Sequence, residues 1–450
     1  MRSPDFGVRR RDCRTRGRSL QDVSPFSTPP KRMTPQERHN AICNVTGEAL
    51  WGFQSAMVLS TTVLTVLLTQ LGAARTTIGL IPALENMGMF LPIVGIYVFR
   101  SHKKRKVRIV LYHYLVLTPC LGAMGLFVLA HGLIPRDLRK GLLIATWGLF
   151  MAGAGVVGAA WLDWIAHLFR REIRGTVTGL GWGFSSLAGI AGALTSGWAL
   201  RGNHDINTFG WLYLAAAAFS VFSITMFLAV RDPAEDLSKD FAPGLRDMVA
   251  AARESIADIP FRRVLAGRCL SLAGFCVGPF IVLHYLSPAG GGLGDSLVVS
   301  LGAAQTAGSA VSCMLFGRIG DRVGHRFGML VGIIFQIGSL ASVLLIRGPV
   351  GCFLAMLLSG CVVGTLLISY MNLVVESCPH NVRSAHLMIG NMVVGLAGLV
   401  FPIAGAFIAA RAGIRPLMEV SFAVSALALA WSLWKVRDPR HEPQGLRQKG

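Results

Sequence analysis

Gly317-Arg-Ile-Gly-Asp321-Arg322-Val-Gly324-His-Arg326 is a short basic stretch between two long apolar runs, Leu297–Phe316 and Phe327–Ile346. A chain that leaves a membrane here and re-enters it at once must turn sharply. Gly317 and Gly324 provide backbone freedom where a side chain would clash. We expect Asp321 to cap the next helix or to pair with Arg322, Arg326 or a neighbouring loop. The arginines favour a turn on the cytoplasmic side of the membrane.

The pattern of this stretch, G-x-x-x-D-R-x-G-x-R, resembles the loop signature of the major facilitator superfamily of secondary transporters. The first half of the chain carries a worn copy, Gly95-Ile-Tyr-Val-Phe99-Arg100-Ser-His102-Lys-Lys-Arg105, with Phe99 in place of the Asp and His102 in place of the second Gly. The resemblance implies a charged gate on the inner face, built mainly in the second half. We expect Gly317, Asp321, Arg322, Gly324 and Arg326 to form it with Glu376 and Arg383; the alternative is a set of interfacial charges that only fix loop topology.

Composition places the chain in a bilayer. Of its 450 residues 53% are hydrophobic and 15% charged, which is less charge than a soluble protein of this size carries. Apolar runs long enough to cross a hydrocarbon core of roughly 30 Å recur along the sequence. Twelve are expected, at Val45–Leu71, Ile78–Phe99, Ile109–His131, Leu142–Ala166, Thr176–Leu200, Thr208–Val230, Val264–Leu286, Leu297–Phe316, Phe327–Ile346, Val350–Val375, Ala385–Ala410 and Leu417–Lys435.

The runs divide the chain into five parts. Residues 1–40 are read as a disordered basic tail, with Met33 as an alternative start, and residues 437–450 as a second cytoplasmic tail. Two six-helix bundles, 41–231 and 263–436, flank a linker at 232–262 that has the i, i+3, i+4 pattern of an interfacial helix. The fold class is therefore all-α membrane protein, with twelve transmembrane helices in two pseudo-symmetric bundles.

An internal repeat supports two related halves. Val230-Arg-Asp-Pro233 closes the first six runs and Val436-Arg-Asp-Pro439 the second six, 206 residues later. At an offset of 209, Gly181 matches Gly390 and Gly189 matches Gly398. Parallel repeats of this kind place a substrate site near the midplane between the halves.

Charge predicts the orientation. The net charge of +20 is explained by Lys and Arg in loops on one face, not by a nucleic-acid partner. Loops on the other face, such as Ser287–Asp295, carry little charge, although Arg136, Arg139 and Lys140 oppose the trend. We expect a multi-pass protein of the cytoplasmic (inner) membrane, with both termini in the cytoplasm.

Polar side chains within the spans are the candidates for transport, since they are costly in a bilayer. Glu85 is the deepest carboxylate and the first candidate for binding and releasing a coupling proton. Glu48 and Asp163 are expected nearer the cytoplasmic ends, where water can solvate them, and Arg268 is expected to pair with an acid or attract an anion. Gln54, Gln305 and Asn391 are cavity candidates, with hydrogen bonds between helices as the alternative. Gly-rich patterns in the fifth and eleventh spans predict close helix approach, but the fifth lacks the Gly-Pro kink found in many antiporters of the family.

The sequence contains no motif that indicates an enzyme, an ATP-driven pump or a metalloprotein. There is no Gly-Lys-Ser/Thr phosphate loop, no catalytic triad and no metal-ligand spacing, and the nine cysteines form no Cys-x-x-Cys. We expect no enzymatic activity, no cofactor and no metal. The interpretation is a monomeric secondary transporter that moves a small solute by alternating access, driven by a proton or other ion, with export favoured over uptake. The competing interpretation is a non-transporting assembly factor or partner of another membrane complex on the same fold.

Overall fold

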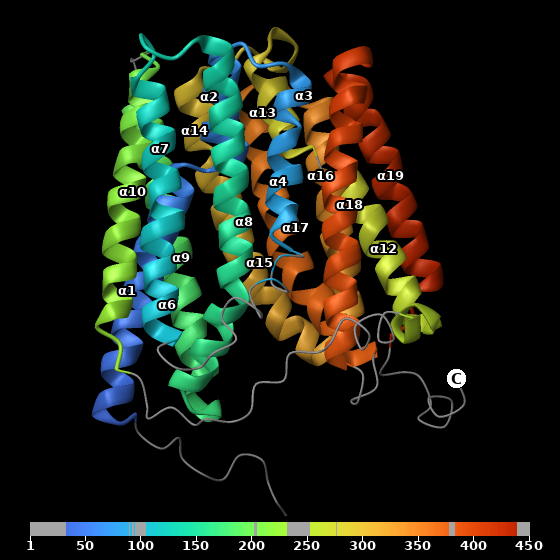
Figure 1. Ribbon diagram of the computed structural model, residues 1–450. Coiled ribbons are helices and arrows are strands. Elements are labelled where there is room, and N and C mark those ends of the chain that lie inside the picture. Colours follow the sequence, from blue (N-terminus) through green and yellow to red (C-terminus); the bar gives the residue numbers. More distant parts are fainter. Residues whose placement is uncertain are drawn as a thin grey trace, which may run out of the picture.

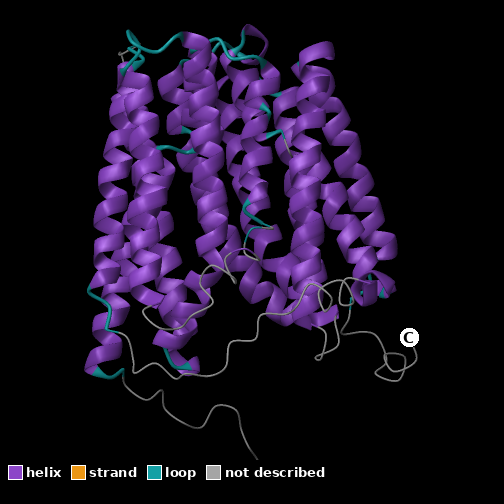
Figure 2. Cartoon of the chain, viewed as in Figure 1, coloured by secondary structure: helices purple, strands orange, loops and turns teal. Residues whose placement is uncertain are grey.

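The computed structural model describes residues 33–89, 91, 94, 105–201, 205–231, 253–275, 277–377 and 383–438. Within these ranges the chain is helical, with short connecting loops and no strand (Figure 2). Four predicted segments lie mostly outside the described residues: the N-terminal tail, the worn signature at 95–105, the linker and the C-terminal tail.

The first half runs through six spans (Figure 1). Its first span consists of α1 (Pro35–Met57), the π-helix η1 (Ser60–Leu64) and α2 (Thr65–Gln70), and its second begins with α3 (Arg75–Ile78) and α4 (Leu80–Met87). The third consists of α6 (Arg105–Tyr112), the π-helix η2 (His113–Leu117) and α7 (Thr118–Leu129). The remaining three are single helices: α8 (Arg136–Leu168), α9 (Arg171–Ala199) and α10 (Asn207–Leu228).

The second half repeats this plan. Its first two spans are each built in two pieces: α12 (Ile259–Phe275) with α13 (Gly278–Leu286), then α14 (Asp295–Ser300) with α15 (Gly302–Val323). A short 3-10 turn, η3 (Pro288–Gly290), joins them. Four single helices follow: α16 (His325–Leu345), α17 (Gly348–Ser377), α18 (Arg383–Ala412) and α19 (Ile414–Lys435).

The hydropathy prediction of the spans is confirmed. Eleven helices of the described chain are long and apolar enough to cross a membrane, and α3 with α4 occupies the place of the remaining predicted span. The first helix begins earlier than the predicted boundary at residue 41, because Thr34 and Glu37 form a capping box and Pro35 fits the first helical turn.

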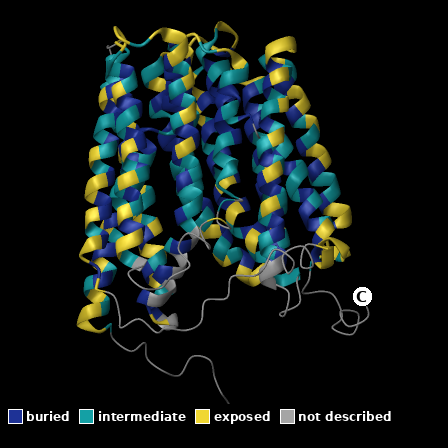
Figure 3. Ribbon diagram, viewed as in Figure 1, coloured by how far each residue is buried: buried dark blue, intermediate teal, exposed yellow. Residues whose placement is uncertain are grey.

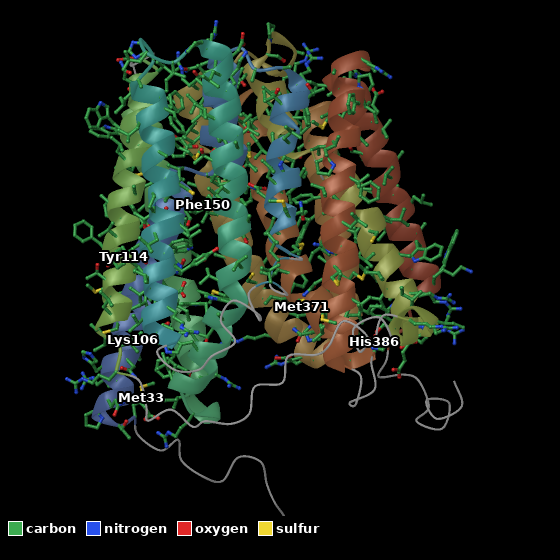
Figure 4. The ribbon with its side chains drawn as sticks, in the orientation of Figure 1. Met33, Lys106, Tyr114, Phe150, Met371 and His386 are labelled. Atoms are coloured by element: carbon green, nitrogen blue, oxygen red, sulfur yellow. The ribbon has the colours of Figure 1, made fainter. Side chains whose placement is uncertain are left out.

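Burial follows from the helix arrangement. Large apolar side chains such as Leu115, Trp211 and Trp434 point outward and are 67%, 63% and 81% exposed, as residues that face lipid must be. Buried positions lie between the helices (Figure 3). We call the face where α1 begins and α19 ends the terminal face, and the other the opposite face; Met33, labelled in Figure 4, lies at the terminal face.

Small residues bring the helices together, since lipid removes the hydrophobic drive for helix association. A β-carbon on Gly52 of α1 would overlap Ser185 of α9, and one on Gly192 would lie 3.0 Å from the carbonyl carbon of Phe53. In the second half, Gly360 of α17 lies directly against the backbone of Gln305 in α15. The close approach predicted for the fifth span is therefore confirmed.

Candidate functional site

A cavity of about 660 Å³ lies in the first half and reaches the second. Its walls come from α1, η2, α8 and α10, with Trp182 of α9 and Asn391 of α18. The residues that give it its chemical character are Glu48, Trp51, His113, Trp161, Phe227 and Asn391. A site that draws on both halves changes shape when the halves move relative to each other, so it can serve as a transport cavity.

Aromatic rings form most of the cavity wall. The rings of Trp161 and Phe227 meet edge to face with centroids 4.2 Å apart, and Trp51 and His113 do so at 5.8 Å. Phe227 reaches this position because Gly47 of α1 has no side chain to obstruct it. Nδ1 of His113 donates to the carbonyl oxygen of Ile109 at 2.8 Å, which leaves Nε2 of the neutral ring as an acceptor. Such a wall favours flat, apolar ligands and, through the ring faces, cations.

Glu48 is a carboxylate that lines the cavity. The sequence placed it nearer the cytoplasmic end of its span; in the structure Glu48 lies past the middle of α1, half-buried in the cavity lining, with a hydrogen bond to Trp161. The reason is that α1 begins at Pro35, so residue 48 is several turns inside the helix. A β-carbon on Gly181 of α9 would lie 3.3 Å from the Glu48 side chain, so this glycine makes room for it.

Glu85 lies apart from the lining of the cavity. Ser60, the first residue of η1, donates a hydrogen bond to its carboxylate. Ser60 follows a break in the first span, because Val58 and Leu59 are not helical and Leu59 has a ψ of 121°. The Glu85 carboxylate is thus hydrogen-bonded at the point where the first span changes from an α-helix to a π-helix.

The other predicted polar residues separate into different roles. Gln54 is buried in α1, where its amide nitrogen donates to Ser55 at 2.9 Å. Gln305 accepts a hydrogen bond from Thr61 of the first half at 3.0 Å. Arg268 lies over the Tyr370 ring, 5.6 Å from its centroid, within the second half. Of the predicted cavity set, Glu48 and Asn391 line the cavity, and the side chain of Asp163 lies outside the described residues.

Contacts between the halves are made by several helix pairs and continue to the opposite face. Helices α4 and α18 pack together, and α9 packs against α14 and α15. Gly398 of α18 lies against Asn86. Gly189 of α9 lies against Thr306, whose methyl carbon would be 3.2 Å from a β-carbon added to the glycine. The two glycines matched by the internal repeat therefore occupy equivalent contacts. Further hydrogen bonds across the seam run from Gln70 to Asp295 at 2.6 Å, from Arg75 to the Ala409 carbonyl at 2.7 Å, and from Ser296 to the Gly197 carbonyl at 2.7 Å.

The basic stretch at the terminal face differs from its predicted geometry. Gly317 and Asp321 both lie inside α15, and Gly324 alone makes the turn, with a φ of +106°. Because Gly324 is itself the N-cap of α16, the predicted capping by Asp321 is wrong. Instead, the buried His325 lies between two carboxylates, 3.6 Å from Asp321 and 4.0 Å from Glu376. The Arg322 side chain is exposed, and that of Arg383 lies outside the described residues.

Arg326 and Lys106 form equivalent clamps in the two halves. Arg326, at the start of α16, donates to the carbonyls of Val436 at 2.7 Å and Leu433 at 2.9 Å, at the end of α19. Lys106, near the start of α6 and labelled in Figure 4, donates to Val230 at 2.8 Å and Leu228 at 3.2 Å. Cations placed at helix C-termini satisfy the last carbonyls and the helix dipole.

Sequence reasoning missed Trp161, His325 and Lys106. Lys106 could have been found from the sequence. It directly follows the worn signature, and Arg326 is the last residue of the intact signature. His325 lies inside the quoted stretch, but its burial between two acids depends on the helical path of α15. Trp161 gives no signal, because a tryptophan in a span can equally face lipid.

Comparisons with known proteins agree with this architecture. A family model, Major Facilitator Superfamily, matches residues 47–402. The multidrug resistance protein MdtG of Escherichia fergusonii is 21% identical over 273 residues, 59% of this chain and 65% of that protein. MdtG of Klebsiella pneumoniae is 22% identical over 74% of this chain and 72% of its own. The first of these matches thus spans less than two thirds of the relative's length.

Solved structures share the fold at low identity. A bacterial homologue of the human lysosomal transporter Spinster, crystallised in an inward-facing, unoccupied conformation, is 14% identical, with a TM-score of 0.65 over 90% of this chain and 98% of that one. A D-xylose-proton symporter is also 14% identical, with a TM-score of 0.65 over 90% and 99%.

Proposed function

This chain belongs to the Major Facilitator Superfamily, and on that premise we propose that it is a proton-coupled secondary transporter that exports an aromatic or apolar organic solute, preferably a cation. The observation that carries the proposal is the cavity of about 660 Å³, in which Glu48 stands among aromatic rings beside Asn391 of the other half. Alternating access then exposes this cavity to one side of the membrane at a time. The protein acts as a monomer in the inner membrane, with the terminal face in the cytoplasm.

The structure supports an arrangement open toward the terminal face. Seam contacts such as Gln70 to Asp295 and Arg75 to Ala409 join the halves near the opposite face. The cavity residue Glu48 lies on the terminal side of the break at Val58, because α1 runs from Pro35 toward that break. Solute would therefore enter from the cytoplasm, which fits export; the names of the MdtG relatives, multidrug resistance proteins, fit the same direction.

Two carboxylates divide the work. Glu48 attracts the cationic solute, because its charge is set against ring faces that also favour cations. Glu85 binds and releases the coupling proton. Its partner Ser60 lies at the break in the first span, next to Thr61, which bonds to Gln305 of the other half. A change of charge at Glu85 would therefore alter the hydrogen bonding of a segment that contacts both halves. One proton moved through 100 mV supplies about 2.3 kcal/mol.

The charges of the terminal face act as the gate of the second half. His325, set between Asp321 and Glu376, would hold the cytoplasmic ends in place when the cavity faces outward, together with the adjacent Arg322 and Arg326 and with Arg383 at the start of α18. Arg268 and Gln54 serve this cycle as packing and hydrogen-bonding residues of their own halves. Asp163 is a further candidate for binding solute or proton.

A flux assay in proteoliposomes with an imposed pH gradient tests the proposal. The probes are a lipophilic cation, tetraphenylphosphonium, and a neutral aromatic of similar size. Wild type should move the cation against its gradient. Glu85→Gln should lose uphill movement but keep binding and downhill exchange, and Glu48→Gln should lose cation binding. Asp137→Asn, which changes a carboxylate 93% exposed on the opposite face, is the matched control and should behave as wild type.

Each outcome bears on a separate claim. Equal uphill flux in Glu85→Gln would remove the proton-coupling role of that residue. If wild type binds the cation no more tightly than the neutral probe, and Glu48→Gln behaves in the same way, the proposed preference for cations is refuted. No flux of any solute by folded wild-type protein would leave the assembly-factor interpretation as the better one.

A further inference from the structure

A second, smaller cavity lies at the opposite face, on the seam between the halves. It has a volume of about 240 Å³. Arg75 of α3 reaches it from the first half, while His284, Ser287, Arg347, Arg415 and Met418 come from the second. Loops of this face such as Ser287–Asp295 carry little charge, so three arginines at one cavity need a physical explanation.

The floor and the rim of this cavity differ in character. Val343 and Met418 form an apolar floor and are 3% and 0% exposed. Arg75, Arg347 and Arg415 also line it, and all three are exposed residues. Among the described residues that line it there is no carboxylate. An apolar base under a positive rim suits a ligand with one anionic end.

Two of the arginines stand where a cation is least favoured. Arg347 directly precedes α17, which begins at Gly348, and Arg415 is the second residue of α19. The N-terminus of a helix presents free N–H groups and the positive end of the dipole. The charges of the arginines and of the helix ends therefore add together, and a bound anion would relieve both.

Two other cations of this face, Arg136 and Arg139, bond to backbone carbonyls away from the cavity. Arg136 donates to the carbonyl of Gln70 at 2.7 Å, and Arg139 is buried with hydrogen bonds to His131 and Ile134. Within the cavity, Arg75 is bonded to Ala409, and Arg415 pairs with Glu419 through a surface contact of 3.1 Å. Arg347 has no hydrogen bond or ion pair with any described part of the chain. The combined positive charge of Arg75, Arg347 and Arg415 exceeds the single negative charge of Glu419, the partner of Arg415.

We propose that this cavity binds a phosphate-type anion, which bridges Arg75 of the first half to Arg347 and Arg415 of the second. Guanidinium groups suit a phosphate because they bind it in two-point fashion. The anion is either a free phosphate group or the headgroup of an anionic lipid. Since the site spans the seam, an anion that binds it when this face is closed stabilises the closed arrangement over the open one.

Thermal unfolding of the full-length protein tests the site without any transport measurement, so its outcome is independent of the proposed function. In detergent, inorganic phosphate is titrated against chloride at equal ionic strength. In nanodiscs, phosphatidylglycerol is compared with phosphatidylcholine. A ligand that binds the folded state raises the unfolding temperature as its concentration exceeds the dissociation constant.

The test variant is Arg347→Gln with Arg415→Gln, and the control is Arg201→Gln, an exposed arginine that does not line the cavity. We expect phosphate or phosphatidylglycerol to raise the unfolding temperature of wild type and of the control. The double variant should bind the same anion roughly tenfold more weakly or worse, as expected for lost charge-assisted hydrogen bonds. Its unfolding temperature without ligand shows whether it is folded.

The two arms identify the source of the anion. A response to inorganic phosphate in detergent supports a free anion, and a response to phosphatidylglycerol alone supports a lipid headgroup. An equal response of wild type and the double variant in both arms, or no response of wild type in either, overturns the proposal.

Discussion

The hydrogen bond from Gln70 to Asp295 offers the sharpest test of how the opposite face closes. Nε2 of Gln70, the last residue of α2, donates to the Asp295 carboxylate at 2.6 Å, and Asp295 begins α14 in the other half. Both side chains are partly exposed. In Gln70→Ala this contact between the halves is lost, while Asp295 remains able to bind water.

The expected size follows from the chemistry of the contact. A hydrogen bond to a charged group contributes about 1.5–3 kcal/mol to stability, and partial exposure lowers this to about 1–2 kcal/mol. If the bond forms only when the face is closed, its loss shifts the closed-to-open ratio by about 5- to 30-fold toward open. The fold itself should be little affected, since the bond joins two bundles rather than the helices of one.

Spin labels measure the shift. In a background without native cysteines, Leu133→Cys in the first half and Leu345→Cys in the second place labels on side chains 88% and 81% exposed at this face. Pulsed dipolar distances should show a larger open population in Gln70→Ala than in wild type. Asn207→Ala is the matched control, because Asn207 bonds on the same face to Asp205 of its own half.

A distance distribution unchanged in Gln70→Ala would refute the reasoning, provided that the variant retains the wild-type unfolding temperature. A double-mutant cycle with Asp295→Ala adds a second criterion. A coupling energy near zero would mean that the two side chains do not support closure together.

Three further predictions concern stability. Gly360→Ala should lower the free energy of unfolding by about 1–3 kcal/mol, because the added methyl group meets the Gln305 backbone. Gly141→Ala is the control and should not lower it, because the space around Gly141 is open. Equal unfolding temperatures of the two variants would contradict the close packing of α15 and α17. Arg326→Gln and Lys106→Gln should each cost about 1–2 kcal/mol and to a similar extent, since each cation caps two carbonyls of its own half; a loss in thermal stability for Arg326→Gln alone would argue against equivalent clamps. Thr34→Ala should cost about 1 kcal/mol and speed hydrogen exchange in the first turn of α1 about fivefold, and unchanged exchange there would show that the cap contributes nothing.

The fold was accessible from the sequence because a bilayer imposes strict lengths and satisfied backbones. The apolar runs predicted the spans, and the repeat predicted two halves whose matched glycines, Gly189 and Gly398, do lie at equivalent contacts.

The detailed site was less accessible, for physical reasons. Glu48 was a candidate because an ionisable side chain in a span is rare, but its depth depended on where α1 begins, which Thr34 and Glu37 decide. The place of Asp321 within α15 depended on Gly324 making the turn alone. The aromatic wall arises from helices distant in sequence, so no local pattern could indicate it. The roles of Glu85 and of the terminal-face charges stay predictions.

The breaks in the first and seventh spans give the two halves matching joints. The first lies at Val58 and Leu59, and the other at Val277, between α12 and α13. Beyond the joints, α13 packs against η1 and α2, with Gly278 beside Thr61. These short outer segments are therefore coupled to each other, while the longer inner segments, α1 and α12, belong to separate bundles. A drug-like molecule wedged between α13 and η1 would consequently lock one joint of each half at once, which makes this contact an attractive place for an inhibitor that never enters the central cavity.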